Sequence, residues 1–175
     1  MTSQTFRGRL LAVVLTMMAA FSLCHAQDAQ MGTLIGESLS KLRQDSSPEA
    51  FQNYVAELKR IDAMYPGSSV PKYYIALQSL NFAVMNPHAE QTEGLIAEAE
   101  HAISQMEEIQ DADQSDLFTL KGFLYMVRIV QDPATNGPRY YLDVMNYYEK
   151  ALKLNPENQI ALQLQQKCKE GMSRR

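Results

Sequence analysis

The sequence predicts an all-α domain built from antiparallel helix hairpins. In each segment after about residue 30, apolar side chains recur at spacings of three and four, which is the period of one helix face. No run in this part alternates between apolar and polar residues as a half-buried strand would. Short breakers such as Pro66-Gly67 and Asn155-Pro156 separate the segments, and short connections favour antiparallel neighbours.

Residues 1–26 have the layout of a secretory signal peptide. Arg7 and Arg9 precede an uncharged, mostly apolar run over 10–23, and Ala26 stands before the expected cleavage point. This run is shorter than the roughly 20 residues of a membrane-spanning helix. Cys24 keeps a lipoprotein signal as the alternative, although Leu23 is larger than the residue expected before a lipidated cysteine. We therefore expect residues 27–175 to form one exported domain, either periplasmic or secreted.

The charge and cysteine content limit the partners and the source of stability. Removal of Arg7 and Arg9 from the 16 basic residues leaves 14, against 20 acidic residues, so the expected net charge is about −6. Nucleic acid is therefore an unsuitable partner, because its binding depends on neutralising phosphates. Cys168 remains as the single thiol and cannot form an intrachain disulfide, so we predict that it is a small apolar side chain on a helix face.

Each of the first three helices is predicted from an apolar stripe between breakers. The first stripe covers 31–42, and the Ser-Ser-Pro-Glu sequence at 46–49 begins the second helix, because proline is tolerated in a first helical turn. Pro66-Gly67 ends that helix. The third begins at Pro71 and ends near Asn86-Pro87.

The later helices follow the same logic. The fourth helix has its inner face between Leu95 and Ile109, and the fifth follows the acidic residues of 113–116, which favour a helix N-terminus. We predict a loop over 132–138, because this range contains two prolines and a glycine, and we expect it to cover the helix ends before the sixth helix. The seventh, over 157–172, has one apolar line and is otherwise polar, as a capping helix requires.

Two helices combine rings with small residues in the pattern of a tetratricopeptide repeat. The matching positions are Phe118, Gly122 and Tyr125 in the first helix, and Tyr148, Ala151 and Pro156 in and after the second. Lys121 departs from the pattern, which has leucine there. Asn86-Pro87 and Asp132-Pro133 mark an internal repeat with an offset of about 46 residues, which is in the range of HEAT-like repeats and exceeds the standard 34. We favour the tetratricopeptide interpretation because of the ring pattern.

This resemblance implies about three hairpins wound into a right-handed superhelix, with a C-terminal capping helix. The chain is also similar to small exported tetratricopeptide proteins of Bacteroidetes, through YYIAL at 73–77, VQDPATNGPRYY at 130–141 and EKALKLNPEN at 149–158. That group has no assigned activity. The narrower likeness therefore implies a fold and a compartment, and no mechanism.

Tetratricopeptide proteins generally bind peptides along the concave surface formed by the first helix of each repeat. Carried over to this chain, the resemblance implies a binding stripe formed by Tyr73, Leu77, Asn81, Thr119, Phe123 and Val127. For Leu77, Phe123 and Val127 an ordinary core position is an equal alternative. We predict a scaffold that binds a protein or peptide. A second copy of the chain, in a homo-oligomer, is the alternative partner. A permanently docked accessory subunit of an envelope assembly or transport machine is the alternative function.

Catalytic and metal-binding patterns are absent from the sequence. It contains no G-x-S-x-G, no H-E-x-x-H and no phosphate-binding glycine loop. Neither His88 nor His101 lies four residues from another good metal ligand, and a zinc site would need its other ligands from elsewhere in the chain. We therefore predict no catalytic activity, no metal site and no cofactor.

Acidic residues recur on the fourth predicted helix. Glu93, Glu100 and Glu107 are seven apart and so share one stripe, which we place opposite the apolar face. A solvated helix is the simpler explanation of this stripe. The alternative is an acidic surface that attracts a basic partner, or the basic C-terminus of a second copy.

Overall fold

In the computed structural model of the chain, the described residues are 29–42, 45 and 47–173. These residues form helices and connections without a strand, so the all-α prediction is confirmed. The predicted signal peptide and the cysteine at position 24 lie outside the described residues. A helical segment over 29–42 is followed by α2 (Pro48–Met64), α3 (Val70–Met85), α4 (Thr92–Glu107), α5 (Gln114–Gln131), α6 (Pro133–Leu154) and α7 (Gln159–Ser173).

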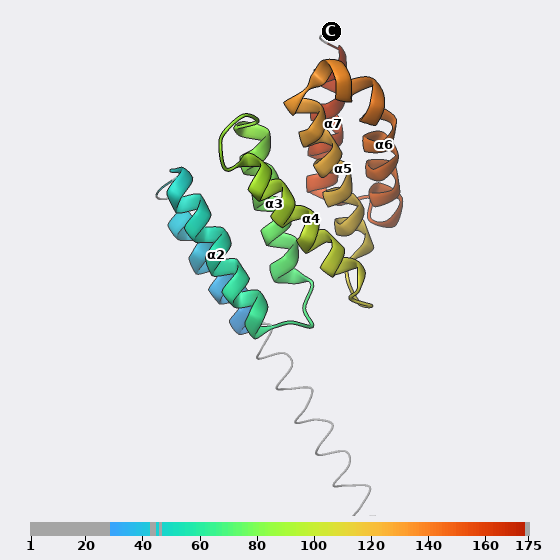
Figure 1. The fold of residues 1–175 in the computed structure, drawn as a ribbon. Helices are drawn as coiled ribbons and strands as arrows, with labels where there is room; N and C mark the ends of the chain where they lie inside the picture. The colour runs from blue at the N-terminus through green and yellow to red at the C-terminus, as the bar shows by residue number, and fades with distance from the viewer. Residues whose placement is uncertain (1–28, 43–44, 46, 174–175) are drawn as a thin grey trace, which may run out of the picture.

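The helices lie side by side in chain order. Figure 1 shows segment 29–42 beside α2, then α3 with α4, and then α5, α6 and α7 on the right. The most extensive packing joins α5 to α6 and α3 to α4, while α3 also packs against α2 and α5. Each helix from α2 onward thus packs against the next one in the chain. In addition, α5 contacts both α3 and α7.

Side-chain caps place two of the helix starts where the sequence predicts them. Ser47 Oγ accepts a hydrogen bond from the backbone N–H of Ala50 at 3.1 Å, with Pro48 in the first turn of α2. An Asp113 side-chain oxygen accepts from the backbone N–H of Asp116 at 3.0 Å, which caps α5. Each cap satisfies a backbone donor that has no partner within its helix.

The predicted loop over 132–138 is wrong, because α6 already begins at Pro133. Asp132 caps the helix by accepting from the backbone N–H of Thr135 at 3.1 Å, and Pro133 occupies a first-turn position that proline tolerates. Asn136 Nδ2 then donates to the carbonyl of Arg128 at 2.7 Å and ties the new helix to the end of α5. Pro138 lies inside the helix, where it removes one backbone hydrogen bond. In Figure 1 the beginning of α6 crosses the top of the molecule before the helix runs down beside α5.

The pairing of α5 with α6 uses the predicted ring and small residues. Tyr148 is 0% exposed, and Ala151 one turn later is also buried. A Cβ added at Gly122 would lie 2.7 Å from Cε1 of the Tyr148 ring, so glycine is what lets the ring approach the α5 backbone. Pro156 follows the end of α6, as the motif predicts. The Tyr148 ring of α6 therefore occupies the space that a side chain at position 122 of α5 would fill.

A hydrogen-bond network that the sequence analysis missed attaches α7 to this pair. Asn158 Nδ2 donates to Ser115 Oγ at 2.9 Å and to Asp116 Oδ1 at 3.0 Å. Its Oδ1 accepts from the backbone N–H of Ala161 at 3.0 Å, at the first turn of α7. Ser115 Oγ in turn donates to the carbonyl of Ala151 at 2.9 Å. The Asn158 amide thus joins the starts of α5 and α7, and Ser115 extends the network to the end of α6.

Candidate functional site

The structure buries most of the stripe that the tetratricopeptide resemblance selects for binding. Leu77, Thr119, Phe123 and Val127 are all buried, and Thr119 Oγ1 donates to a carbonyl of its own helix. Their burial favours the core alternative for these positions. The two remaining members of the stripe, Tyr73 and Asn81, are partly exposed.

An apolar groove of about 240 Å³ is lined by other residues of α3 and α5, together with residues of α7. Its lining residues are Val84 from α3, Met126, Ile129 and Val130 from α5, and Lys167, Cys168 and Gly171 from α7. Val84 is one residue from the end of α3, and Val130 is one residue from the end of α5. The groove therefore lies along the C-terminal parts of three alternate helices.

The floor of the groove is uncharged, and its edge carries a cation. Met126, Ile129 and Cys168 are buried, while Val130 is partly exposed. Burial raises the pKa of the Cys168 thiol, so this side chain stays protonated and behaves as a small apolar group. Among the described residues of the lining, Lys167 is the only charged one, and it is exposed. Among the hydrogen bonds and ion pairs of the described residues, none involves its ammonium group. The groove thus combines an apolar surface with one available positive charge.

A column of aromatic rings covers another side of the α5–α6 pair. The Tyr125 and Tyr147 rings stack with centroids 5.8 Å apart and an 8° angle between their planes. Phe118 extends the column at 6.2 Å from Tyr147, and Tyr140 does so at 5.1 Å from Tyr125. Lys150 lies over the Phe118 and Tyr147 rings. Because the ring faces contact one another and a cation, we assign the column to stabilising the helix pair.

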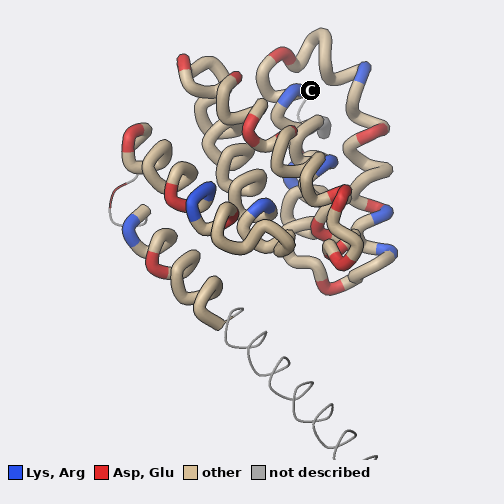
Figure 2. The backbone as a smooth tube through the Cα atoms, turned by 60° about the horizontal axis from the view of Figure 1, so that its bottom comes forward, with Lys and Arg blue, Asp and Glu red and all other residues tan. Residues whose placement is uncertain are grey.

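The acidic stripe of α4 is neutralised within the chain. Arg128 of α5 binds Glu93 at 2.9 Å and Glu100 at 3.3 Å, and Lys121 forms an ion pair with Glu107. The hydrogen bond from Arg128 is the main cause of the lowered pKa of Glu93. Figure 2 shows acidic and basic positions intermixed along the helices. The stripe faces basic residues of the neighbouring helix, and this pairing within the chain argues against attraction of a basic partner.

His88 and His101 lie on the surface. His88 is exposed, and the exposed His101 lines a cavity of about 160 Å³ between α2, α3 and α4. The ion pair between Lys59 and Glu98, at 2.8 Å, lies at the same cavity. Within the described part of the chain, no three or more His, Cys, Asp or Glu side chains are grouped so as to hold a metal ion. None of the described helices is long and apolar enough to cross a membrane.

Comparison with protein-family models, with curated proteins and with solved structures found no match to this chain. The tetratricopeptide resemblance therefore depends on the motif residues of α5 and α6 and on the pairing of successive helices. A fold does not by itself determine a function.

Proposed function

We propose that this chain is an exported, non-catalytic scaffold that holds a segment of another protein in the groove between α3, α5 and α7. In this proposal the chain is a tetratricopeptide-type superhelix of three hairpins, with α7 as its cap. The observation that supports it is the origin of the groove lining in alternate helices. In such a superhelix these helices form the inner face, which is where a peptide binds.

The chemistry of the groove specifies its occupant. A volume of about 240 Å³ with an apolar floor accommodates a few aliphatic side chains. Lys167 at the edge adds attraction for a carboxylate, because charge complementarity steers and orients a partner. We therefore propose a peptide segment that carries aliphatic side chains beside an acidic residue.

Selection from a displayed peptide library on the full chain tests this proposal. The unmodified chain is expected to enrich peptides that combine aliphatic and acidic residues. Val130→Asp is expected to abolish their binding, because it places a carboxylate in the apolar lining. Lys167→Glu is expected to reverse the charge preference toward basic peptides. Lys169→Glu makes the same charge change on the same helix outside the groove lining, and is expected to leave the preference unchanged.

Two results would overturn this proposal. One is enrichment of the same peptides by the Val130→Asp variant, and the other is a charge preference that does not respond to Lys167→Glu. The accessory-subunit alternative would require a continuous apolar face. Large exposed apolar side chains in the described part are instead spread over several helices, at Met64, Val70, Met85, Leu142, Leu154 and Leu162.

A further inference from the structure

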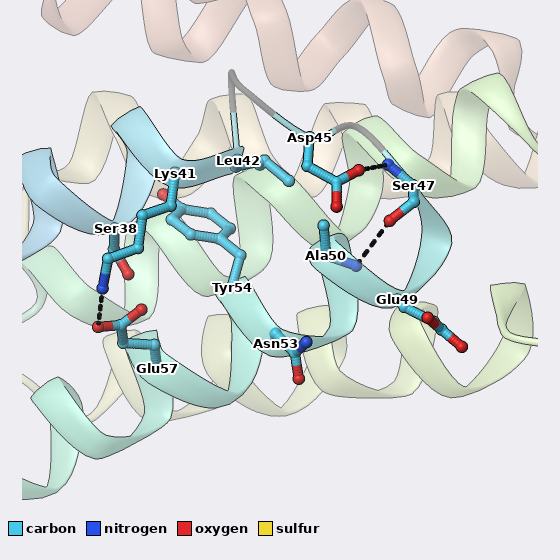
Figure 3. A pocket seen from close by; sticks show the side chains of 10 residues that line it. All are labelled: Ser38, Lys41, Leu42, Asp45, Ser47, Glu49, Ala50, Asn53, Tyr54 and Glu57. Atoms are coloured by element: carbon cyan, nitrogen blue, oxygen red, sulfur yellow. Dashed lines mark hydrogen bonds and ion pairs between the residues drawn. The ribbon is translucent and has the colours of Figure 1, made fainter.

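A second cavity, of about 280 Å³, lies between segment 29–42 and α2. Figure 3 shows its lining, in which the Tyr54 ring of α2 extends toward segment 29–42 beside Lys41. Ser38 from that segment faces Glu57 of α2. The cavity shares no lining residue with the groove at α3, α5 and α7. It is therefore a separate candidate site.

Two buried hydroxyl groups of this cavity have no hydrogen-bond partner. Ser38 is 1% exposed and Tyr54 is 3% exposed, and neither Ser38 Oγ nor the Tyr54 hydroxyl forms a hydrogen bond. Buried polar groups in proteins are nearly always paired, and an unpaired one lowers stability. Burial is the first cause that raises the pKa of Tyr54 to about 12, so this hydroxyl is neutral and can both donate and accept. The free protein thus leaves two buried polar groups available to a ligand.

The charges around the cavity favour a cation. Among the described residues that line it, three carry carboxylates, Asp45, Glu49 and Glu57, and one carries an ammonium group, Lys41. Lys41 pairs with Glu57 at 3.2 Å, but their side chains are 68% and 36% exposed, so the pair is weak and can be exchanged. The pKa of Glu57 is lowered, with the Ser38 hydroxyl as the first cause and Lys41 and Arg60 as further causes. Glu57 therefore stays ionised at neutral pH.

We propose that this cavity binds a small organic amine in its primary ammonium form. An ammonium group has three N–H donors and no acceptor. Ser38, Tyr54 and Glu57, whose side chains each carry an acceptor oxygen, are among the residues that line the same cavity. The Tyr54 ring offers an apolar surface to the alkyl part of the amine and attraction to its charge. The exposed Lys41 side chain moves into solvent when the ligand replaces it at Glu57.

Titration calorimetry on the full chain at pH 7 tests this inference with n-butylamine as the probe. Tetramethylammonium, which has the charge without N–H donors, and acetate, an anion, are the control ligands. Of these three compounds, we expect only n-butylamine to bind saturably. Glu57→Gln is expected to weaken it about tenfold or more, since a hydrogen bond to a charged group is lost. Glu98→Gln is the matched control, because Glu98 is also 36% exposed and paired with a lysine, and it is expected to bind normally.

Tyr54→Phe separates a binding role from a structural one. Removal of an unpartnered buried hydroxyl is expected to leave the Tm of the free protein unchanged or higher, because no hydrogen bond is lost. The same substitution is expected to weaken n-butylamine binding. The inference is overturned by absence of saturable binding, by equal binding of tetramethylammonium or acetate, or by Tyr54→Phe binding as tightly as the unmodified chain.

Discussion

Tyr148→Ala is expected to lower the free energy of unfolding by about 3–5 kcal/mol, which is the usual cost of truncating a buried aromatic side chain. The ring is 0% exposed and packs on the backbone of α5 at Gly122. Its loss leaves a cavity between α5 and α6, the most extensively packed pair of helices. Urea unfolding followed by circular dichroism measures this change.

Tyr148→Phe is the control for this prediction. The Tyr148 hydroxyl donates only to the sulfur of Met126, at 3.7 Å, and sulfur is a weak acceptor. We expect a change below about 1 kcal/mol for the phenylalanine variant, because the ring and its packing remain. An alanine variant as stable as the phenylalanine variant would show that the ring does not hold the two helices together.

Lys72→Met is expected to lower the free energy of unfolding by about 2–4 kcal/mol, which is somewhat below the usual cost of breaking a buried ion pair. Lys72 is 4% exposed, and its ammonium donates to Asp62 Oδ1 at 2.6 Å and to the carbonyl of Pro66 at 3.1 Å. A third bond reaches the carbonyl of Ser68 at 3.3 Å. One side chain of α3 therefore holds α2 and the connection between the two helices. The Asp62 side chain is 18% exposed, so solvent partly compensates the charge that is left.

Lys59→Met provides the comparison for Lys72, since its partner Glu98 is also a carboxylate. Because the side chains of that pair are 51% and 36% exposed, we expect Lys59→Met to lower the free energy of unfolding by less than about 1 kcal/mol. Combining Asp62→Asn with Lys72→Met is expected to cost less than the sum of the two single changes, because no unpaired charge remains. Equal losses for the two lysine variants in chemical denaturation would contradict the structural role of Lys72.

Most helix boundaries could be predicted because local chemistry determines them. Ser47-Pro48 supplies a cap and a first-turn proline, and α6 ends before Asn155-Pro156, because proline disfavours a helical conformation in the residue before it. The start of α6 was missed because the prolines and glycine of 132–138 also fit a loop. A single hydrogen bond to the Asp132 side chain and the tertiary contact of Asn136 favour the helix.

The groove could not be predicted from the sequence, because it depends on how the helices rotate against one another. α5 carries apolar residues on most of its sides, so periodicity does not identify the side that faces the groove. The part of the stripe on α5, which ends at Val127, is buried, whereas Val130, three residues later, lines the groove. The pairing of Arg128 with two glutamates of α4 was missed for a related reason, since it joins residues about 30 positions apart.

In this account, α5 and α6 pair because the Tyr148 ring packs where Gly122 has no side chain. Comparison of Gly122→Ala with Gly94→Ala tests this most directly. No glycine in the described part has a positive φ, so added strain comes from the neighbours alone. At Gly94 nothing lies within 4 Å of an added Cβ, and alanine is expected to raise the unfolding free energy by up to about 1 kcal/mol. At Gly122 the new methyl meets the Tyr148 ring, and overpacking is expected to lower the unfolding free energy by about 1–3 kcal/mol. Urea denaturation of both variants should give changes of opposite sign, and a Gly122→Ala protein as stable as the unmodified chain would contradict the account.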